Sequence, residues 1–155
     1  FAGEFGGVEH RIELVREIGK VRYYNDSIAS SPSRTIAGLR SFDRKVILIA
    51  GGYDKHIPFD VLGPEVVAHA KRLYLTGDTA QKIRRAVEGA AEFDPAALPI
   101  VETADLREAV EAAHRAAEPG DVVLMSPACA SFDRYKNFME RGEAFKAMVA
   151  ALPER

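Results

Sequence analysis

The chain has 155 residues, the length of one compact domain, and its 47% hydrophobic and 28% charged residues are typical of a soluble globular protein. A net charge of −2 gives no electrostatic reason to expect nucleic acid or an anionic membrane as partner. The single cysteine, Cys129, excludes an internal disulfide and favours the cytoplasm, and no apolar run approaches the roughly 20 residues of a membrane-spanning helix.

Apolar segments rich in β-forming residues alternate along the chain with segments of helical periodicity. The predicted strands are residues 11–20, 21–26, 45–50, 71–76, 98–103 and 121–126. The predicted helices are residues 31–42, 58–70, 78–90 and 104–117, with a last helix near the C-terminus. This alternation favours an α/β fold, a Rossmann-like three-layer sandwich with a mostly parallel sheet. The first two strands are expected to form an antiparallel hairpin at its edge, within one domain that spans residues 1–155.

Local signals predict boundaries and inward faces of these elements. Gly19-Lys20 suits the hairpin turn, Ser31 suits a helix cap, and Gly63-Pro64 is expected to interrupt the second helix. Helical spacing predicts several core-facing side chains. They are Ile83, Val87 and Ala90; Leu106, Val110, Ala113 and Ala117; and Phe138, Phe145, Val149 and Leu152.

Small, hydroxyl and charged residues follow four of the predicted strands. In an open α/β sheet, ligands bind beyond the carboxyl ends of the strands. The candidate residues are Asp26, Ser27 and Ser30; Gly51, Gly52, Asp54 and Lys55; Gly77; and Ser126, Cys129, Ser131 and Asp133.

Each candidate also has a structural interpretation. Asp26 could cap a turn, Lys55 could be a solvated surface lysine, and Cys129 is more often a small buried residue than a nucleophile. Ser131 could cap a helix, and His10 could be exposed near the start of a strand.

Several sequence motifs of other enzyme classes are absent. The chain has no G-x-x-x-x-G-K-[ST] phosphate loop, no G-x-G-x-x-G, no H-E-x-x-H, no paired cysteines and no G-x-S-x-G. The sheet can therefore offer a ligand site, but without a phosphate cradle of its own.

Five segments, taken together, resemble the C-terminal domain of the Mur ligases. They are GGVEHRIELV, YYNDSIASSPSRTIAGL, ILIAGGYDK, LTGDTAQKI and LMSPACASFDRYKNFMERGEAF. The similarity runs from about His10 to Phe145 and is greatest to the family members that add D-glutamate. The last segment is highly specific, whereas G-G-x-D-K is moderately so.

The resemblance implies a three-domain, monomeric enzyme of the bacterial cytoplasm. Its first domain binds the UDP-sugar, and its central domain carries the phosphate loop and the ligands of Mg²⁺. The third binds the amino acid and closes over ATP. The chain resembles only the third domain, and its lack of an initiator methionine fits that expectation.

The same resemblance implies the chemistry. ATP phosphorylates the carboxylate of UDP-N-acetylmuramoyl-L-alanine, and the amine of D-glutamate attacks the acyl phosphate. This reaction needs positioned substrates and stabilised phosphate charge, but no protein nucleophile. No catalytic residue and no metal ligand are therefore expected in this domain, which should be inactive alone.

Carried over by position, the resemblance implies a set of residues that hold D-glutamate. Lys55 would pair with one of its carboxylates. The other residues of the set are Ser30, Ser131, Phe132 and Phe138.

A second set would reach ATP. It contains Arg11 and Asp26, with His10 as a weaker member. Many family members have lysine two residues after the aspartate, where this chain has Ile28, and Arg34 is a candidate substitute.

Two alternatives remain open. The first is the equivalent domain of another Mur or folylpolyglutamate-type ligase, although the D-x-P-R-type motif of the diamino-acid enzymes is absent. The second is a stand-alone Rossmann-like binding module, because a fold does not by itself define a function.

Overall fold

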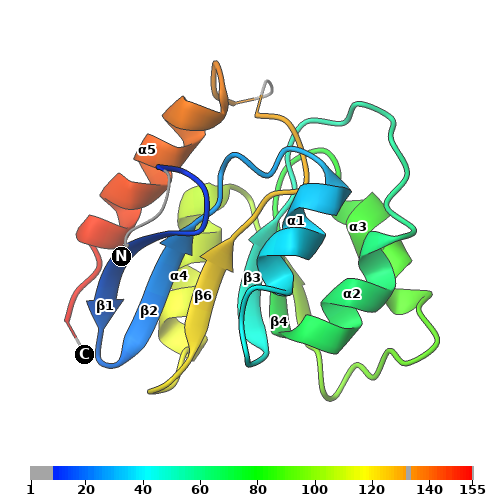
Figure 1. Ribbon diagram of the computed structural model, residues 1–155, viewed down its shortest axis with the longest axis horizontal. Helices are drawn as coiled ribbons and strands as arrows, with labels where there is room; N and C mark the ends of the chain where they lie inside the picture. Colours follow the sequence, from blue (N-terminus) through cyan, green and yellow to red (C-terminus); the bar gives the residue numbers. More distant parts are fainter. Residues whose placement is uncertain (1–8, 132–133, 155) are drawn as a thin grey trace.

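A computed structural model describes residues 9–131 and 134–154 and shows a three-layer α/β sandwich (Figure 1). The strands are β1 (Glu13–Ile18), β2 (Val21–Asn25), β3 (Val46–Ala50), β4 (Ala70–Leu75), β5 (Ile100–Glu102) and β6 (Val122–Met125). The helices are α1 (Pro32–Leu39), α2 (Leu62–His69), α3 (Ala80–Glu88), α4 (Leu106–Ala116) and α5 (Phe138–Ala150).

The six strands form one sheet in the order β1-β2-β6-β3-β4-β5. Only the β1–β2 pair is antiparallel, and the other neighbouring strands pair in parallel. Gly19 and Lys20 have φ angles of 54° and 64°, which suit a two-residue hairpin turn. The predicted fold class and the antiparallel edge hairpin are therefore confirmed.

Each face of the sheet has its own apolar core, because successive strand residues point to opposite faces. In β3, Leu48 and Ala50 belong to the core on the side of α1, α2 and α3. Ile47 and Ile49 belong to the core on the side of α4 and α5. All five residues of β3 are buried, as expected of a central parallel strand.

The structure corrects three details of the helix predictions. Residues 58–61 are not helical, and α2 begins at Leu62, so that Gly63-Pro64 lies in its first turn instead of interrupting it. A Cβ at Gly63 would collide with the backbone of the neighbouring α3, which explains a glycine at this position. Ala90 lies beyond the end of α3 and is only partly buried.

The last helix differs from its prediction at one residue. Phe145 and Val149 are buried in the core, as is Leu152 just after the helix, but Phe138 is only half-buried.

Ser31 occupies the cap position of α1, yet its side chain makes no capping hydrogen bond.

Strand β6 lies between β2 and β3, and its chain leaves the sheet on the opposite side from theirs. β2 and β3 lead into α1 and α2 on one face, whereas β6 leads into α5 on the other. Crevices open at the carboxyl ends of strands where such connections diverge. The fold therefore favours ligand sites on either side of the end of β6.

Within residues 9–131 and 134–154, no helix has the length and apolar character required to cross a membrane.

Candidate functional site at the carboxyl ends of β2, β3 and β6

Asp26 directly follows β2 and lies beside the end of β6, and only 3% of its surface is exposed. Its Oδ2 atom accepts a hydrogen bond of 2.7 Å from Ser126 Oγ, and its Oδ1 atom accepts one of 3.2 Å from the backbone N–H of Ile12. Ser126 also hydrogen-bonds to Thr35 of α1, 3.0 Å away. A buried network thus connects both strands, the start of β1 and the first helix.

Burial raises the pKa of Asp26 from 3.8 to about 6, because a carboxylate loses its hydration there. The hydrogen bonds from Ser126 and Ile12 and the positive charges of Arg11 and Arg34 lower the pKa and offset only part of that rise. The carboxylate is therefore mostly ionised at neutral pH, but it becomes protonated in mildly acidic solution.

We expect this pKa shift to make the protein less stable as the pH rises from about 4 to about 6. In this window the folded chain holds a proton on Asp26 that the unfolded chain releases, so raising the pH favours unfolding. The shift from 3.8 to about 6 corresponds to about 3 kcal/mol. Denaturant unfolding across this pH range should show the loss in the wild type and a flatter profile in Asp26→Asn; equal slopes would contradict the assignment.

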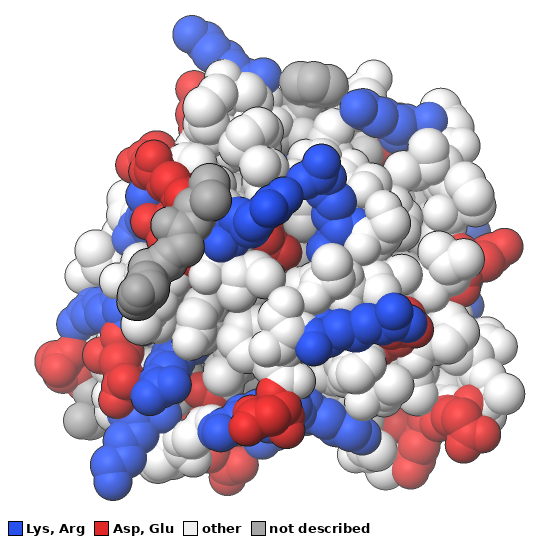
Figure 2. Space-filling model, in the orientation of Figure 1, with Lys and Arg blue, Asp and Glu red and all other residues white. Residues whose placement is uncertain are grey.

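Two arginines face the same pocket as Asp26. This pocket, of about 330 Å³, lies along α1 and is lined by Arg11, Asp26, Ile28 and Arg34, among other residues. Arg11 and Arg34 are exposed, and neither forms an ion pair within the described residues. Figure 2 shows basic side chains near the middle of the face on which α1 lies. Arg34 and Ile28 line the same pocket, and the role of Arg34 as a substitute cation stays a prediction.

The start of α1 adds positive potential to this region. Its first turn has no side-chain cap, because Ser31 Oγ lies near Ser33 Oγ, at 3.3 Å, and not on a helix N–H group. Pro32 has no N–H group, and the N–H groups of Arg34 and Thr35 donate to the Ser31 carbonyl. The helix dipole and the N–H of Ser33 are therefore what the start of α1 offers to an anion such as phosphate.

His10 is buried, with 4% of its surface exposed, so the suggestion that it is an exposed residue is wrong. Its Nδ1 atom lies 2.8 Å from Asn25 Nδ2, and its ring meets the ring of Phe138 edge-on at a centroid distance of 6.0 Å. A Cβ at Gly142 would collide with this ring. His10 thus holds the segment that carries Arg11 against β2 and α5.

Arg141 of α5 joins the loops that follow β2 and β6. Its guanidinium donates to Ser27 Oγ at 3.0 Å, to the Ser27 carbonyl at 2.8 Å and to the Cys129 carbonyl at 2.8 Å. The arginine is only 4% exposed. Ser27 Oγ in turn donates to the carbonyl of Phe138 at 2.6 Å. These bonds give both loops and the start of α5 one common anchor.

Sequence reasoning missed Arg141, although a signal for it was present. Phe138, Arg141, Phe145 and Val149 are spaced three, four and four residues apart, which puts the arginine on the inward face of the helix. A charged residue at a core-facing position must be paired or hydrogen-bonded.

The loop after β3 carries Lys55 and lies against the loop after β6. The backbone N–H of Tyr53 donates to the Ala130 carbonyl at 3.0 Å, and the N–H of Gly51 donates to the Pro127 carbonyl at 2.9 Å. Gly51 has a φ angle of 111° and approaches the backbone of Thr76, so no other residue would fit there without strain. Lys55 itself is exposed.

Ser131 follows directly in the loop after β6. It is 3% exposed, and its hydroxyl makes no hydrogen bond within residues 9–131 and 134–154. It does not cap α5, because Asn137 does so by accepting a hydrogen bond of 2.8 Å from the N–H of Glu140. A buried hydroxyl without a protein partner is favourable only if a ligand or water satisfies it.

The structure brings most of the predicted site residues to one end of the sheet. The loop with Ser30 is tied to the β6 loop by the N–H of Ala128, which donates to the Ala29 carbonyl at 3.0 Å. Ser30 is partly buried, and Phe138 is partly buried with its ring against His10. Phe132 lies outside the described residues.

Cys129 fits its structural interpretation. It is 2% exposed, and its Sγ atom lies 3.2 Å from the hydroxyl of Thr79.

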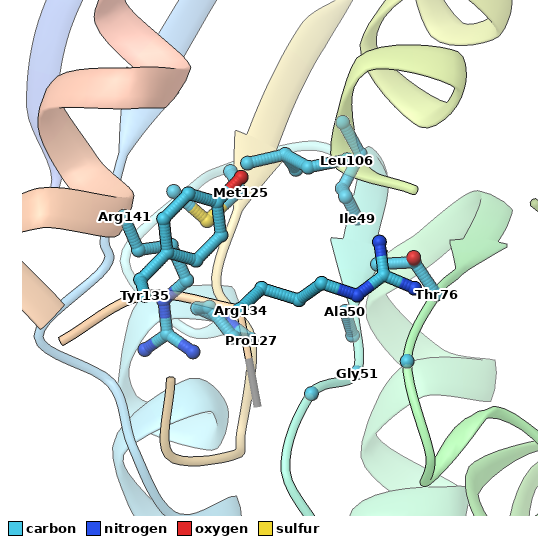
Figure 3. Close-up of a pocket in the computed structure, with 12 residues that line it drawn as sticks. Ile49, Ala50, Gly51, Thr76, Leu106, Met125, Pro127, Arg134, Tyr135 and Arg141 are labelled. Atoms are coloured by element: carbon cyan, nitrogen blue, oxygen red, sulfur yellow. The ribbon is translucent and has the colours of Figure 1, made fainter. Parts of the chain in front are cut away.

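A small pocket lies on the other side of these loops, facing α4 and α5 (Figure 3). Arg134 extends across it in Figure 3 and donates to the Ala104 carbonyl at 3.3 Å. The cavity holds about 40 Å³, which is room for a few water molecules but not for an amino acid. The Asp26 pocket, at about 330 Å³, has room for a larger ligand.

One group of potential metal ligands occurs in the described residues, formed by Glu9, His10 and Glu13. The ammonium of Lys146 lies 2.7 Å from a Glu9 carboxylate oxygen and 3.2 Å from one of Glu13. The hydrogen bond from Lys146 is the largest cause that lowers the pKa of Glu9. The positive charge at the centre of this cluster is thus the ammonium of Lys146.

Comparison with known proteins identifies the family of the chain. The family described as "Mur ligase, glutamate ligase domain" matches residues 10–129. UDP-N-acetylmuramoylalanine–D-glutamate ligase of Acetivibrio thermocellus is 57% identical over 153 residues, or 97% of this chain and 33% of that protein. The enzyme of the same name from Clostridium tetani is 54% identical over 151 residues, again 97% of this chain and 33% of the relative.

Solved structures share the fold at low sequence identity. Mycobacterium tuberculosis folylpolyglutamate synthase, complexed with ADP and AMPPCP, has a TM-score of 0.59 and 15% identity; the match covers 96% of this chain and 33% of that one. A UDP-N-acetylmuramoyl-L-alanyl-D-glutamate–2,6-diaminopimelate ligase has a TM-score of 0.57 and 18% identity, over 82% of this chain and 27% of that one. The chain spans about a third of the length of its curated relatives. With a family match over most of its length, the chain belongs to the Mur ligases, as a glutamate ligase domain.

Proposed function

We propose that this chain is the C-terminal domain of a three-domain, ATP-dependent ligase that adds D-glutamate to UDP-N-acetylmuramoyl-L-alanine. The main support is the meeting of three loops, after β2, β3 and β6, at one end of the sheet. These loops carry Ser30, Lys55 and Ser131. Relatives that are 52–57% identical to this chain are named as D-glutamate ligases. The proposal includes a monomer in the bacterial cytoplasm.

In this proposal Lys55 pairs with one carboxylate of D-glutamate. Its exposed position suits a substrate that arrives from solvent, and an ammonium group is a strong point-charge partner for a carboxylate. The buried hydroxyl of Ser131, which has no hydrogen bond within the described residues, suits the other carboxylate. Ser30, Phe132 and Phe138 complete the proposed set.

The Asp26 pocket forms the ATP side of the proposed site. Arg11 and Arg34, which line this pocket, supply the positive potential that phosphate oxygens require, and the N-terminal end of the α1 dipole adds to it. Asp26 suits a ribose hydroxyl, because an ionised carboxylate accepts hydrogen bonds. His10 supports this pocket by holding the segment of Arg11.

The proposed contribution of this domain to the reaction is positioning. ATP, with Mg²⁺ held mainly by the central domain, activates the carboxylate of the UDP-linked substrate as an acyl phosphate. Lys55 and Ser131 orient D-glutamate so that its amine faces that carbon, and Arg11 and Arg34 balance phosphate charge. No nucleophile of the chain is required, in agreement with the buried position of Cys129.

A chimera tests this proposal. The chain would replace the matching third of the Acetivibrio thermocellus relative, to which it is 57% identical. We expect phosphate release that depends on ATP, UDP-N-acetylmuramoyl-L-alanine and D-glutamate together, and no release from the 155-residue chain alone. A folded chimera that prefers another amino acid over D-glutamate, or turnover by the chain alone, would contradict the proposal.

A further inference from the structure

The turn that carries Lys55 is held by its neighbour Asp54. One carboxylate oxygen of Asp54 accepts a hydrogen bond of 2.8 Å from the backbone N–H of His56, which closes a turn around Lys55. His56 has a φ angle of 61°, a conformation that non-glycine residues seldom adopt. The side chain of Asp54 therefore maintains an unusual backbone path on both sides of Lys55.

The other oxygen of Asp54 is bound by helix α3. The ammonium of Lys82, in the first turn of this helix, lies 2.6 Å from Asp54 Oδ2. The side chain of Asp54 is 18% exposed and that of Lys82 is 41% exposed. The hydrogen bond from Lys82 is also the largest cause that lowers the pKa of Asp54.

The start of α3 holds the same loop at a second point. The hydroxyl of Thr79 accepts a hydrogen bond of 3.0 Å from the N–H of Gly52, and the N–H of Thr79 donates to the Gly52 carbonyl at 3.3 Å. Hydrogen bonds to α3 thus hold the backbone at Gly52. The next contact with α3 along this loop, among the described residues, is the one between Asp54 and Lys82. Without the Lys82–Asp54 contact, the side chain of Asp54 would lose its hydrogen bond to α3, and the turn around Lys55 would be held less firmly against this helix.

We propose that Lys82 is a positioning residue for the use of D-glutamate, acting through Asp54 on the turn from which Lys55 projects. This inference rests on the proposed role of Lys55. Lys82 does not need to touch the substrate. Because a partly exposed ion pair contributes little to global stability, its effect should be local.

The test compares Lys82→Met with Lys82→Arg and Lys71→Met in the ligase that carries this chain. Lys71 is a matched control, since its ammonium lies 2.9 Å from Asp121 Oδ1 at the opposite end of the sheet. We expect Lys82→Met to raise the KM for D-glutamate about tenfold, with little change in the KM for ATP or in melting temperature. Lys82→Arg should keep most of the affinity, and Lys71→Met should behave as the wild type.

A second readout does not depend on activity. In the 155-residue chain, the pKa of Asp54 measured by NMR should rise toward its ordinary value in Lys82→Met. An unchanged pKa of Asp54 in Lys82→Met would overturn this inference but not the proposed D-glutamate site. The same holds if Lys55→Ala raises the KM for D-glutamate while Lys82→Met leaves that KM at its wild-type value. A wild-type KM in Lys55→Ala would overturn the proposed D-glutamate site, and this inference with it.

Discussion

Replacing Lys55 by alanine in the complete ligase is expected to lower kcat/KM for D-glutamate by about 100-fold. A hydrogen bond to a charged group contributes about 1.5–3 kcal/mol, and each 1.4 kcal/mol corresponds to about a tenfold change. The KM for UDP-N-acetylmuramoyl-L-alanine should change little, because that substrate is proposed to bind to other domains. Initial-rate measurements with each substrate varied in turn would show this difference.

Two variants sharpen the Lys55 experiment. Lys45 is also exposed but precedes β3, at the opposite end of the strand from Lys55, so Lys45→Ala should leave the kinetics unchanged. Lys55→Arg retains the charge but changes its geometry, so we expect partial activity. If Lys55→Ala raised the KM values of both substrates equally, the result would indicate a structural effect on domain closure and not the proposed contact with D-glutamate.

Replacing Arg141 by leucine is expected to destabilise the folded chain by about 3–5 kcal/mol. The change leaves the buried carbonyls of Ser27 and Cys129 without their donor, and it removes the anchor between two loops. For a chain of this length, the melting temperature should fall by about 10 °C or more. Thermal and denaturant unfolding of the 155-residue chain would measure the loss.

Arg40 provides the matched control for Arg141. The Arg40 guanidinium donates to a carboxylate instead of to carbonyls, with 2.7 Å between its Nη2 atom and Glu65 Oε2, and its side chain is 62% exposed. Because water screens exposed ion pairs, Arg40→Leu should cost less than about 1 kcal/mol. A loss of the same size in both variants would mean that burial does not distinguish the two arginines.

The layer order was predictable because it depends on local patterns. Continuous apolar runs such as residues 46–50 require burial on both faces, and strand–helix alternation leads to parallel pairing. The hairpin turn at Gly19-Lys20 also followed from a local signal, because few residue pairs adopt two positive φ angles. Polar residues after buried strands then predicted a ligand site at the carboxyl ends of the strands, and the structure brings these residues together there, although the site itself stays a prediction.

Errors occurred where tertiary packing outweighed local signals. Gly63 looked like a helix breaker, but close contact with α3 requires a residue without a side chain there. Helical spacing placed Phe138 in the core, yet it begins α5, where its ring meets His10 instead. Ser31 has the right position for a cap, but its hydroxyl lies near Ser33.

By itself, then, the sequence determined the fold class, the edge hairpin and the family, because these depend on periodicity and on motifs in adjacent residues. Only the tertiary structure decided the burial of Asp26 and its raised pKa, since its partner Ser126 is 100 residues away. The anchoring role of Arg141 likewise depends on Ser27, 114 residues distant. Hydrogen bonds between such distant residues form only after the sheet has brought their strands together, so no local pattern records them.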